Sequence, residues 1–171
     1  PDAAMYWLML MIEGGEDPEF IARRLVILAS EDVGLADSEG LRVAVAAADA
    51  LAYVGLPEAT YHLAHATLFL ATAPKSNSVG RAIAEARRLV QDGPTPSVPL
   101  HLRSTGYRGA ADLGHGEGYL YSHDHPGGVV DQQYFPDGVE PTAVYHPGDE
   151  GREKLITERL ARIDSVLRRR R

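Results

Sequence analysis

Apolar positions recur at helical spacing near the start of the chain, so that a predicted helix has one apolar and one polar side. The apolar face consists of Ile21, Leu25, Leu28 and Ala29. This spacing is typical of an amphipathic helix packed on a core. Asp17 can cap the free amide groups of the first turn, and Pro18 suits the first helical position. Gly34 can close this helix, and Asp37 or Ser38 can cap the next one, which predicts two helices joined by a short acidic turn.

Further helices are predicted on both sides of this pair. Residues 2–13 are apolar nearly all round, which is typical of a helix buried on several sides, and Gly14 with Gly15 ends it. An alanine-rich helix is expected over residues 43–55, and Pro57 is expected to start the next one. Three later apolar stripes mark more helices: Ala59, Leu63, Ala66 and Leu70; Val79, Ile83, Ala86 and Val90, expected to face inward after a cap at Asn77; and Ile156, Leu160, Ile163 and Leu167.

Short connections between these helices predict an all-α fold, with a compact antiparallel helical bundle over residues 1–93. Residues 94–148 are dense in Gly, Pro, Tyr and His, which is not typical of a bundle. We expect them to form a long ordered arm that is held on the bundle by its aromatic side chains. Short strand pairings are expected within it, around residues 118–123 and 129–135. A C-terminal helix within residues 149–171 completes what is expected to be one structural domain.

The composition narrows the class of protein. The chain has 171 residues, 44% of them apolar, and no apolar run approaches the roughly 18 residues that a membrane span needs. It contains no cysteine, which excludes disulfides, thiolate metal sites and cysteine nucleophiles and is compatible with the cytoplasm. Because the chain begins with Pro1 in a segment that already looks helical, we expect it to be cut from a longer protein.

The net charge of −7 argues against a strongly basic nucleic-acid-binding domain. The charge is unevenly distributed: residues 1–74 carry eleven acidic and three basic side chains, whereas residues 75–108 carry two acidic and six basic ones. Such blocks can attract one another within the fold or between subunits, or they can leave a local basic face for phosphates. The candidate DNA or phosphate contacts are Arg81, Arg87, Arg88, Arg103 and Arg108, together with the arginines of residues 168–171.

One stretch looks enzyme-like, because His123, Asp124 and His125 place two imidazoles and a carboxylate side by side. A catalytic zinc site needs about three protein ligands, so a metal-dependent hydrolase centred on His123 and His125 would have to recruit a further histidine. The histidines available for that role are His101, His115 and His146. The structural alternative is a turn, in which Pro126 fixes its own φ and Gly127 permits a positive φ.

Motifs of nucleotide and ester chemistry are missing from the chain. It contains no phosphate-binding loop of the GxxxxGK[ST] type and no GxSxG nucleophile elbow. We therefore expect no catalytic residue, no bound cofactor and no ATP hydrolysis in this chain by itself.

Four stretches of the chain, in order, resemble the C-terminal region of a bacterial family of replication-associated recombination proteins, also called MgsA or RarA, which is related to the Werner-helicase-interacting ATPases. They are FIARRLVILASEDVGLAD from Phe20, ATAPKSN from Ala71, VPLHLR from Val98 and GYLYSHDHPGGVVDQQYFP from Gly118. The residues of the family-like structural motif are Glu31, Asp32, Pro74, Lys75, Ser76, Asn77, His101, Arg103, His123, Asp124, Pro126 and Gly127. The chain departs from the family at Ser104, where Asn is expected, at His125, where Tyr is expected, and in the glycine-rich residues 104–114.

This resemblance implies that the chain is the helical region that follows the ATPase core of a AAA+ ATPase related to clamp loaders, with a fold like the clamp-loader collar. It places the Walker motifs, ATP and Mg²⁺ in the part of the parent protein upstream of Pro1. It further implies a homotetramer that acts in the bacterial cytoplasm, at the nucleoid, on stalled or gapped replication forks during recombination and repair, and that associates with single-stranded-DNA-binding protein. The function expected for this region is oligomerisation, and the alternative is a DNA-contacting module.

Overall fold

The computed structural model describes residues 1–93 and 95–167, and every regular element in these ranges is a helix. This confirms the predicted all-α class. No helix in the described ranges is both long and apolar enough to cross a lipid bilayer. The chain divides into two compact units, of which the first contains residues 1–83 and 145–156 and the second the remainder. The expected divisions near residues 93 and 148 stay predictions.

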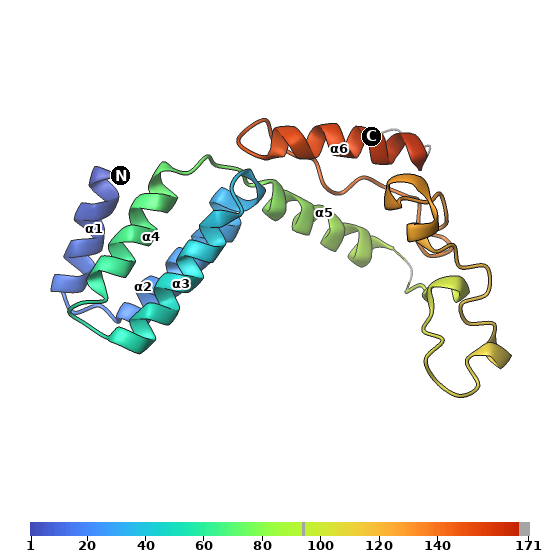
Figure 1. The fold of residues 1–171 in the computed structure, drawn as a ribbon, viewed down its shortest axis with the longest axis horizontal. Coiled ribbons are helices and arrows are strands. Elements are labelled where there is room, and N and C mark those ends of the chain that lie inside the picture. Colours follow the sequence, from blue (N-terminus) through green and yellow to red (C-terminus); the bar gives the residue numbers. More distant parts are fainter. Residues whose placement is uncertain (94, 168–171) are drawn as a thin grey trace. The chain divides into compact units, whose positions relative to one another are not determined.

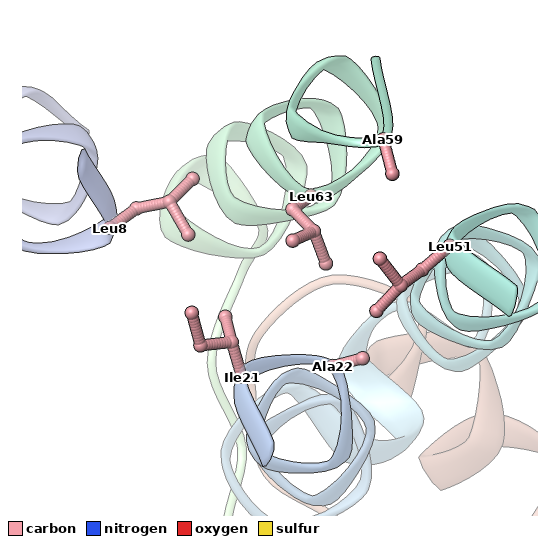
Figure 2. Packing of buried hydrophobic residues seen from close by; sticks show 6 residues of the cluster. All are labelled: Leu8, Ile21, Ala22, Leu51, Ala59 and Leu63. Atoms are coloured by element: carbon pink, nitrogen blue, oxygen red, sulfur yellow. The ribbon is translucent and has the colours of Figure 1, made fainter. Parts of the chain in front are cut away.

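The first unit is a bundle of four α-helices together with the starts of two more (Figure 1). Its helices are α1 (Asp2–Glu13), α2 (Pro18–Leu28), α3 (Glu39–Val54), α4 (Thr60–Thr72), the first turns of α5 (Ser78–Asp92) and the first turn of α6 (Glu153–Val166). The core side chains come from α1 to α4 and from the residue before α4, and they point toward one another between the helices (Figure 2): Leu8, Ile21, Ala22, Leu51, Ala59 and Leu63. The predicted stripe of the fourth helix is therefore its buried face, since Ala66 and Leu70 are buried as well.

The ends of the helices show which of the local sequence patterns predicted the structure correctly. Asp17 caps α2 as predicted, because its carboxylate accepts hydrogen bonds from the backbone N–H groups of Glu19 at 3.0 Å and Phe20 at 3.2 Å. The helix does not stop after Leu28 but continues as a π-helix, η1 (Ala29–Val33), and then as a 3-10 turn, η2 (Gly34–Ala36), with φ of +53° at Gly34. The prediction that Pro57 starts α4 is wrong, because Pro57 lies in a preceding turn that its carbonyl closes by accepting from the N–H of Thr60.

Two predictions of burial are also wrong. In α1, Leu8 is buried, but Trp7 is 59% exposed and Leu10 is 50% exposed, so this helix is covered on one side and not on several. In α5, Ile83 and Val90 are exposed to 53% and 78% instead of facing inward. The reason is the same in both helices: an apolar pattern shows that a face is suited to burial, but not that a neighbour within the same chain covers it.

The second unit contains the later turns of α5, most of α6 (Glu153–Val166) and an arm of loops and 3-10 turns. The turns are η3 (Leu100–Leu102), η4 (Ala111–Leu113), η5 (Ser122–Asp124) and η6 (Pro126–Gly128). The expected strand pairings are wrong for the described part of the arm. There the side-chain amide of Gln132 bonds both the N–H and the C=O of Leu120, each at 3.1 Å, and so replaces a backbone ladder. Residues 168–171, with their predicted phosphate contacts, lie outside the described residues.

Candidate functional site

Three segments far apart in the sequence meet at one end of the first unit. The π-helix η1 lies beside the loop that follows α4, because the backbone carbonyl of Asp32 accepts from the N–H of Ser76 at 2.8 Å. The turn before α6 joins them, because the N–H of Arg152 donates to the carbonyl of Ala36 at 2.8 Å. Gly151 makes this approach feasible: a Cβ atom there would lie 2.2 Å from the carbonyl oxygen of Ala36.

A buried carboxylate fixes this junction. Glu153 is fully buried and accepts hydrogen bonds from the hydroxyl of Ser78, from the Tyr145 hydroxyl at 2.9 Å and from the Gly148 N–H at 2.8 Å. Burial acts to raise the pKa of Glu153, but the hydrogen bonds from Ser76, Ser78, Gly148 and Tyr145 outweigh it and lower the pKa below its usual value. The carboxylate is therefore ionised at neutral pH, and we call these five residues the Glu153 cluster.

Sequence reasoning missed the Glu153 cluster. An acidic residue at the first position of a helix is common on exposed helix ends, so Glu153 carries no mark of burial in the sequence. The partner Ser78 lies 75 positions earlier in the chain. Only the return of residues 145–153 to the start of α5 brings the two together.

The family-like motif supplies much of the same junction. Lys75 donates from Nζ to the carbonyl oxygens of Leu70 at 2.8 Å and Ala73 at 2.5 Å, which satisfies acceptors at the end of α4. Asn77 precedes α5, and its carbonyl oxygen accepts from the Arg81 N–H. Pro74 lies against Gly151, where a Cβ atom would be 2.9 Å from its ring. These residues thus hold helix ends together.

The five candidate phosphate contacts have different surroundings. Arg87 and Arg108 are exposed. Arg88 is paired with Glu85 at 2.6 Å and with Asp92 at 3.6 Å, and the hydrogen bond that it donates to the Glu85 carboxylate raises the pKa of the guanidinium. This pairing neutralises the charge of Arg88 locally.

The other two arginines are bound to backbone carbonyls. Arg81 donates to the carbonyl of His146 at 3.4 Å, and Arg103 donates to that of Val98 at 2.7 Å. Within the second unit the structure brings Arg103 beside His101 in a polar pocket of about 670 Å³.

Two of the three histidines that a metal site near His123 could recruit are engaged elsewhere. His101 bonds the carbonyl of Gln133 at 2.8 Å. His115 lies between the guanidinium of Arg103 and the hydroxyl of Tyr107, at 3.4 Å and 2.8 Å. His123 packs its ring against Tyr121, with the centroids 5.0 Å apart. Across residues 1–93 and 95–167, no three side chains of His, Cys, Asp or Glu lie close enough together to hold a metal ion.

Comparison with known proteins gives consistent matches over nearly the whole chain. The family model described as "MgsA AAA+ ATPase C terminal" matches residues 1–164. An uncharacterised AAA domain-containing protein of Mycobacterium tuberculosis is 52% identical over 99% of the chain and 38% of its own length. Replication-associated recombination protein A of Haemophilus influenzae is 41% identical over 95% of the chain and 37% of its own length, and ATPase WRNIP1 of Dictyostelium discoideum is 36% identical over 93% and 17%. The chain thus spans less than two fifths of each of these relatives.

Proposed function

Because the chain belongs to the family of MgsA AAA+ ATPase C-terminal regions, we propose that it is the assembly domain of a larger ATPase and holds four subunits together. In this proposal the parent protein hydrolyses ATP with Mg²⁺ in a part that the chain does not contain, in a DNA-dependent manner. It acts on fork or gapped DNA in replication-associated recombination and repair, in the bacterial cytoplasm at the nucleoid, where it meets single-stranded-DNA-binding protein. The names of the relatives in Haemophilus influenzae and Dictyostelium discoideum, replication-associated recombination protein A and ATPase WRNIP1, support this proposal.

The observation that carries the assembly role is the uncovered face of α1. Tyr6, Trp7 and Leu10 are exposed to 64%, 59% and 50%, and the Tyr6 and Trp7 rings stack edge to face with centroids 5.6 Å apart. Large aromatic side chains grouped on a surface are typical of protein–protein contacts, where Trp and Tyr are enriched. A subunit contact on this face would provide the burial that the apolar pattern of α1 requires.

Light scattering on the chain at concentrations from about 1 to 100 μM tests this role. We expect a mass near four times the 18.5 kDa of one chain. Leu10→Asp should lower the mass, whereas Leu155→Asp, at a position of α6 that is 64% exposed, should leave it unchanged. A strictly monomeric wild type at tens of micromolar would refute assembly through this region.

The second candidate, a DNA-contacting module, is favoured by the exposure of Arg87 and Arg108. The test is binding of fork DNA at low and moderate salt, because phosphate contacts weaken steeply as salt rises. Arg87→Glu and Arg108→Glu should each weaken binding, and Arg88→Glu should weaken it less, because Glu85 already pairs with Arg88. Undetectable affinity at low salt would assign DNA binding to another part of the parent protein.

A further inference from the structure

An apolar pocket of about 300 Å³ lies between α1, α2 and α4, wholly within the first unit. Its walls include Leu8, Leu28 and Leu70. Thr67 also lines it; this side chain is 8% exposed, and its buried Oγ1 has no hydrogen-bond partner among the described residues. A wall of this kind is suited to apolar side chains of an incoming surface.

The pocket carries opposite charges at its two ends. Arg24, on α2, lies at one end, and Glu31 and Asp32, on η1, lie at the other. The ends are separated by seven positions of nearly continuous helix, or roughly 10 Å at 1.5 Å per residue. None of these three side chains forms a hydrogen bond or ion pair with another residue that the structure describes. Lys75, near the acidic end, is already held by backbone carbonyls.

The exposed face of α1 adjoins the same pocket. Met11 of this helix lines it, and Trp7 is one helical turn from Met11, so the two share a side of α1. The exposed aromatic surface and the pocket are therefore continuous.

We infer that this pocket is the centre of a two-fold contact between two copies of the chain, in which Arg24 of each copy faces Glu31 and Asp32 of the other. The inference rests on the proposed assembly role and assigns it a surface. A two-fold contact uses the same patch on both subunits, so each patch must carry its own complement. A surface with one unpaired positive end and one unpaired negative end meets that requirement when two copies of α2 lie antiparallel.

The position of the two-fold axis follows from the same pairing. Leu28 lies midway between Arg24 and the acidic pair, and it is half-buried in the pocket wall. The axis must therefore pass close to Leu28, and the two copies of this side chain must meet there. Trp7, beside the pocket, becomes buried in the same contact.

Cysteine cross-linking tests the axis directly, because the chain contains no cysteine of its own. Leu28→Cys should form a covalent dimer under mild oxidation, since each copy meets its own equivalent across the axis. Tyr53→Cys, at a position of α3 that is 92% exposed and outside the pocket, is the control for random collisions and should remain largely uncross-linked. Equal cross-linking of the two variants would overturn the inference. So would the absence of cross-linking in Leu28→Cys when wild type is associated under the same conditions.

Charge reversal gives a second readout that does not depend on a cysteine. Arg24→Glu should raise the dissociation constant about tenfold or more, because like charges then face each other twice in each dimer. The pair Glu31→Arg with Asp32→Arg should do the same, and the three changes together should restore association. The fluorescence of Trp7, the single tryptophan of the chain, should shift to shorter wavelength as wild type associates and should not do so in Arg24→Glu.

The outcomes separate the inference from the proposed function. A wild type that stays monomeric refutes both. If wild type assembles, but Leu28→Cys does not cross-link and Arg24→Glu associates as wild type does, the assembly role stands and this contact is refuted. Loss of association in Arg24→Glu without rescue in the triple variant also refutes the reciprocal pairing, provided that the unfolding temperature of the triple variant matches that of wild type.

Discussion

Replacing Glu153 by glutamine should destabilise the first unit, because the replacement keeps the shape of the side chain but removes its charge. The carboxylate accepts from Ser78, Tyr145 and Gly148 while fully buried. Hydrogen bonds to a charged group contribute about 1.5 to 3 kcal/mol each, and an unsatisfied buried donor costs about 1 to 3 kcal/mol. The glutamine oxygen can keep some of these bonds, while its NH₂ group faces the remaining donors. We therefore expect a loss of about 3 kcal/mol in the free energy of unfolding.

Thermal unfolding followed by circular dichroism measures this loss. For a chain of this length, about 3 kcal/mol corresponds to a fall of about 6 to 12 °C in the unfolding temperature. Glu150→Gln is the matched control, because Glu150 precedes the same helix but is exposed, and it should change stability by less than about 0.5 kcal/mol. Equal unfolding temperatures for the two variants would refute the assignment of Glu153 as a stabilising buried charge.

The pH dependence gives an independent check on the same carboxylate. Its pKa is lower in the folded chain than the value of about 4.3 for an unfolded glutamate. The ionised group therefore stabilises the fold fully above pH of about 4.3, and this contribution is lost as the pH falls through the folded pKa. The gap in unfolding temperature between wild type and Glu153→Gln should be constant near neutral pH and narrow in acid. A gap that widens in acid would contradict the sign of the shift.

Three further predictions concern other parts of the chain. Gly151→Ala should lower the free energy of unfolding in denaturant by about 2 to 4 kcal/mol, because φ is +54° there and the new Cβ would lie 2.2 Å from the Ala36 carbonyl oxygen. The control Gly15→Ala, where φ is +80° and the space is open, should lower it by only about 1 kcal/mol. Asp17→Ala should lower the free energy of unfolding by about 1 kcal/mol in the same assay, since it removes the cap of α2 and leaves two backbone donors unpaired. An unchanged denaturant midpoint would show that the cap is dispensable. Metal analysis of protein purified without a histidine tag should find no stoichiometric ion, and one ion per chain that is lost in His123→Ala would revive the metal-dependent hydrolase.

The parts of the fold that the sequence predicted are those that local chemistry determines. Asp17 and Pro18 marked the start of α2, and Gly34 marked the end of the π-helix η1, because caps and positive φ angles depend on a few neighbouring residues. The π-helix η1 was not predictable in this way. It inserts an extra residue per turn where the chain must meet the loop after α4, through Asp32 and Ser76, and this requirement is set by tertiary contacts.

The candidate site was predicted less well, for a physical reason that two examples show. The sequence showed which arginines are candidates for phosphate contacts. It did not show that Arg88 pairs with Glu85, because this pairing depends on which rotamers the helix surface permits. Glu153 looked like an ordinary residue of a helix start, and its burial depends on Ser78, far away in the chain. The family-like residues were recognised by resemblance, whereas their structural role, holding helix ends against residues 145–153, depends on tertiary contacts between segments far apart in the chain.

The Glu153 cluster and the proposed contact surface share a structural element, so a change in one should affect the other. Ser76 bonds both the Glu153 carboxylate and, through its N–H, the carbonyl of Asp32, whose side chain lies at the acidic end of the pocket. Loosening the cluster should therefore let the acidic end move, and a second copy would have to immobilise it on binding. We expect Glu153→Gln to raise the dissociation constant of the assembly about two- to fivefold at 25 °C, less than Arg24→Glu does, as measured by sedimentation equilibrium on protein that is still folded. A dissociation constant equal to that of wild type, in a variant whose unfolding temperature has fallen, would show that the cluster holds the fold together without shaping the contact surface.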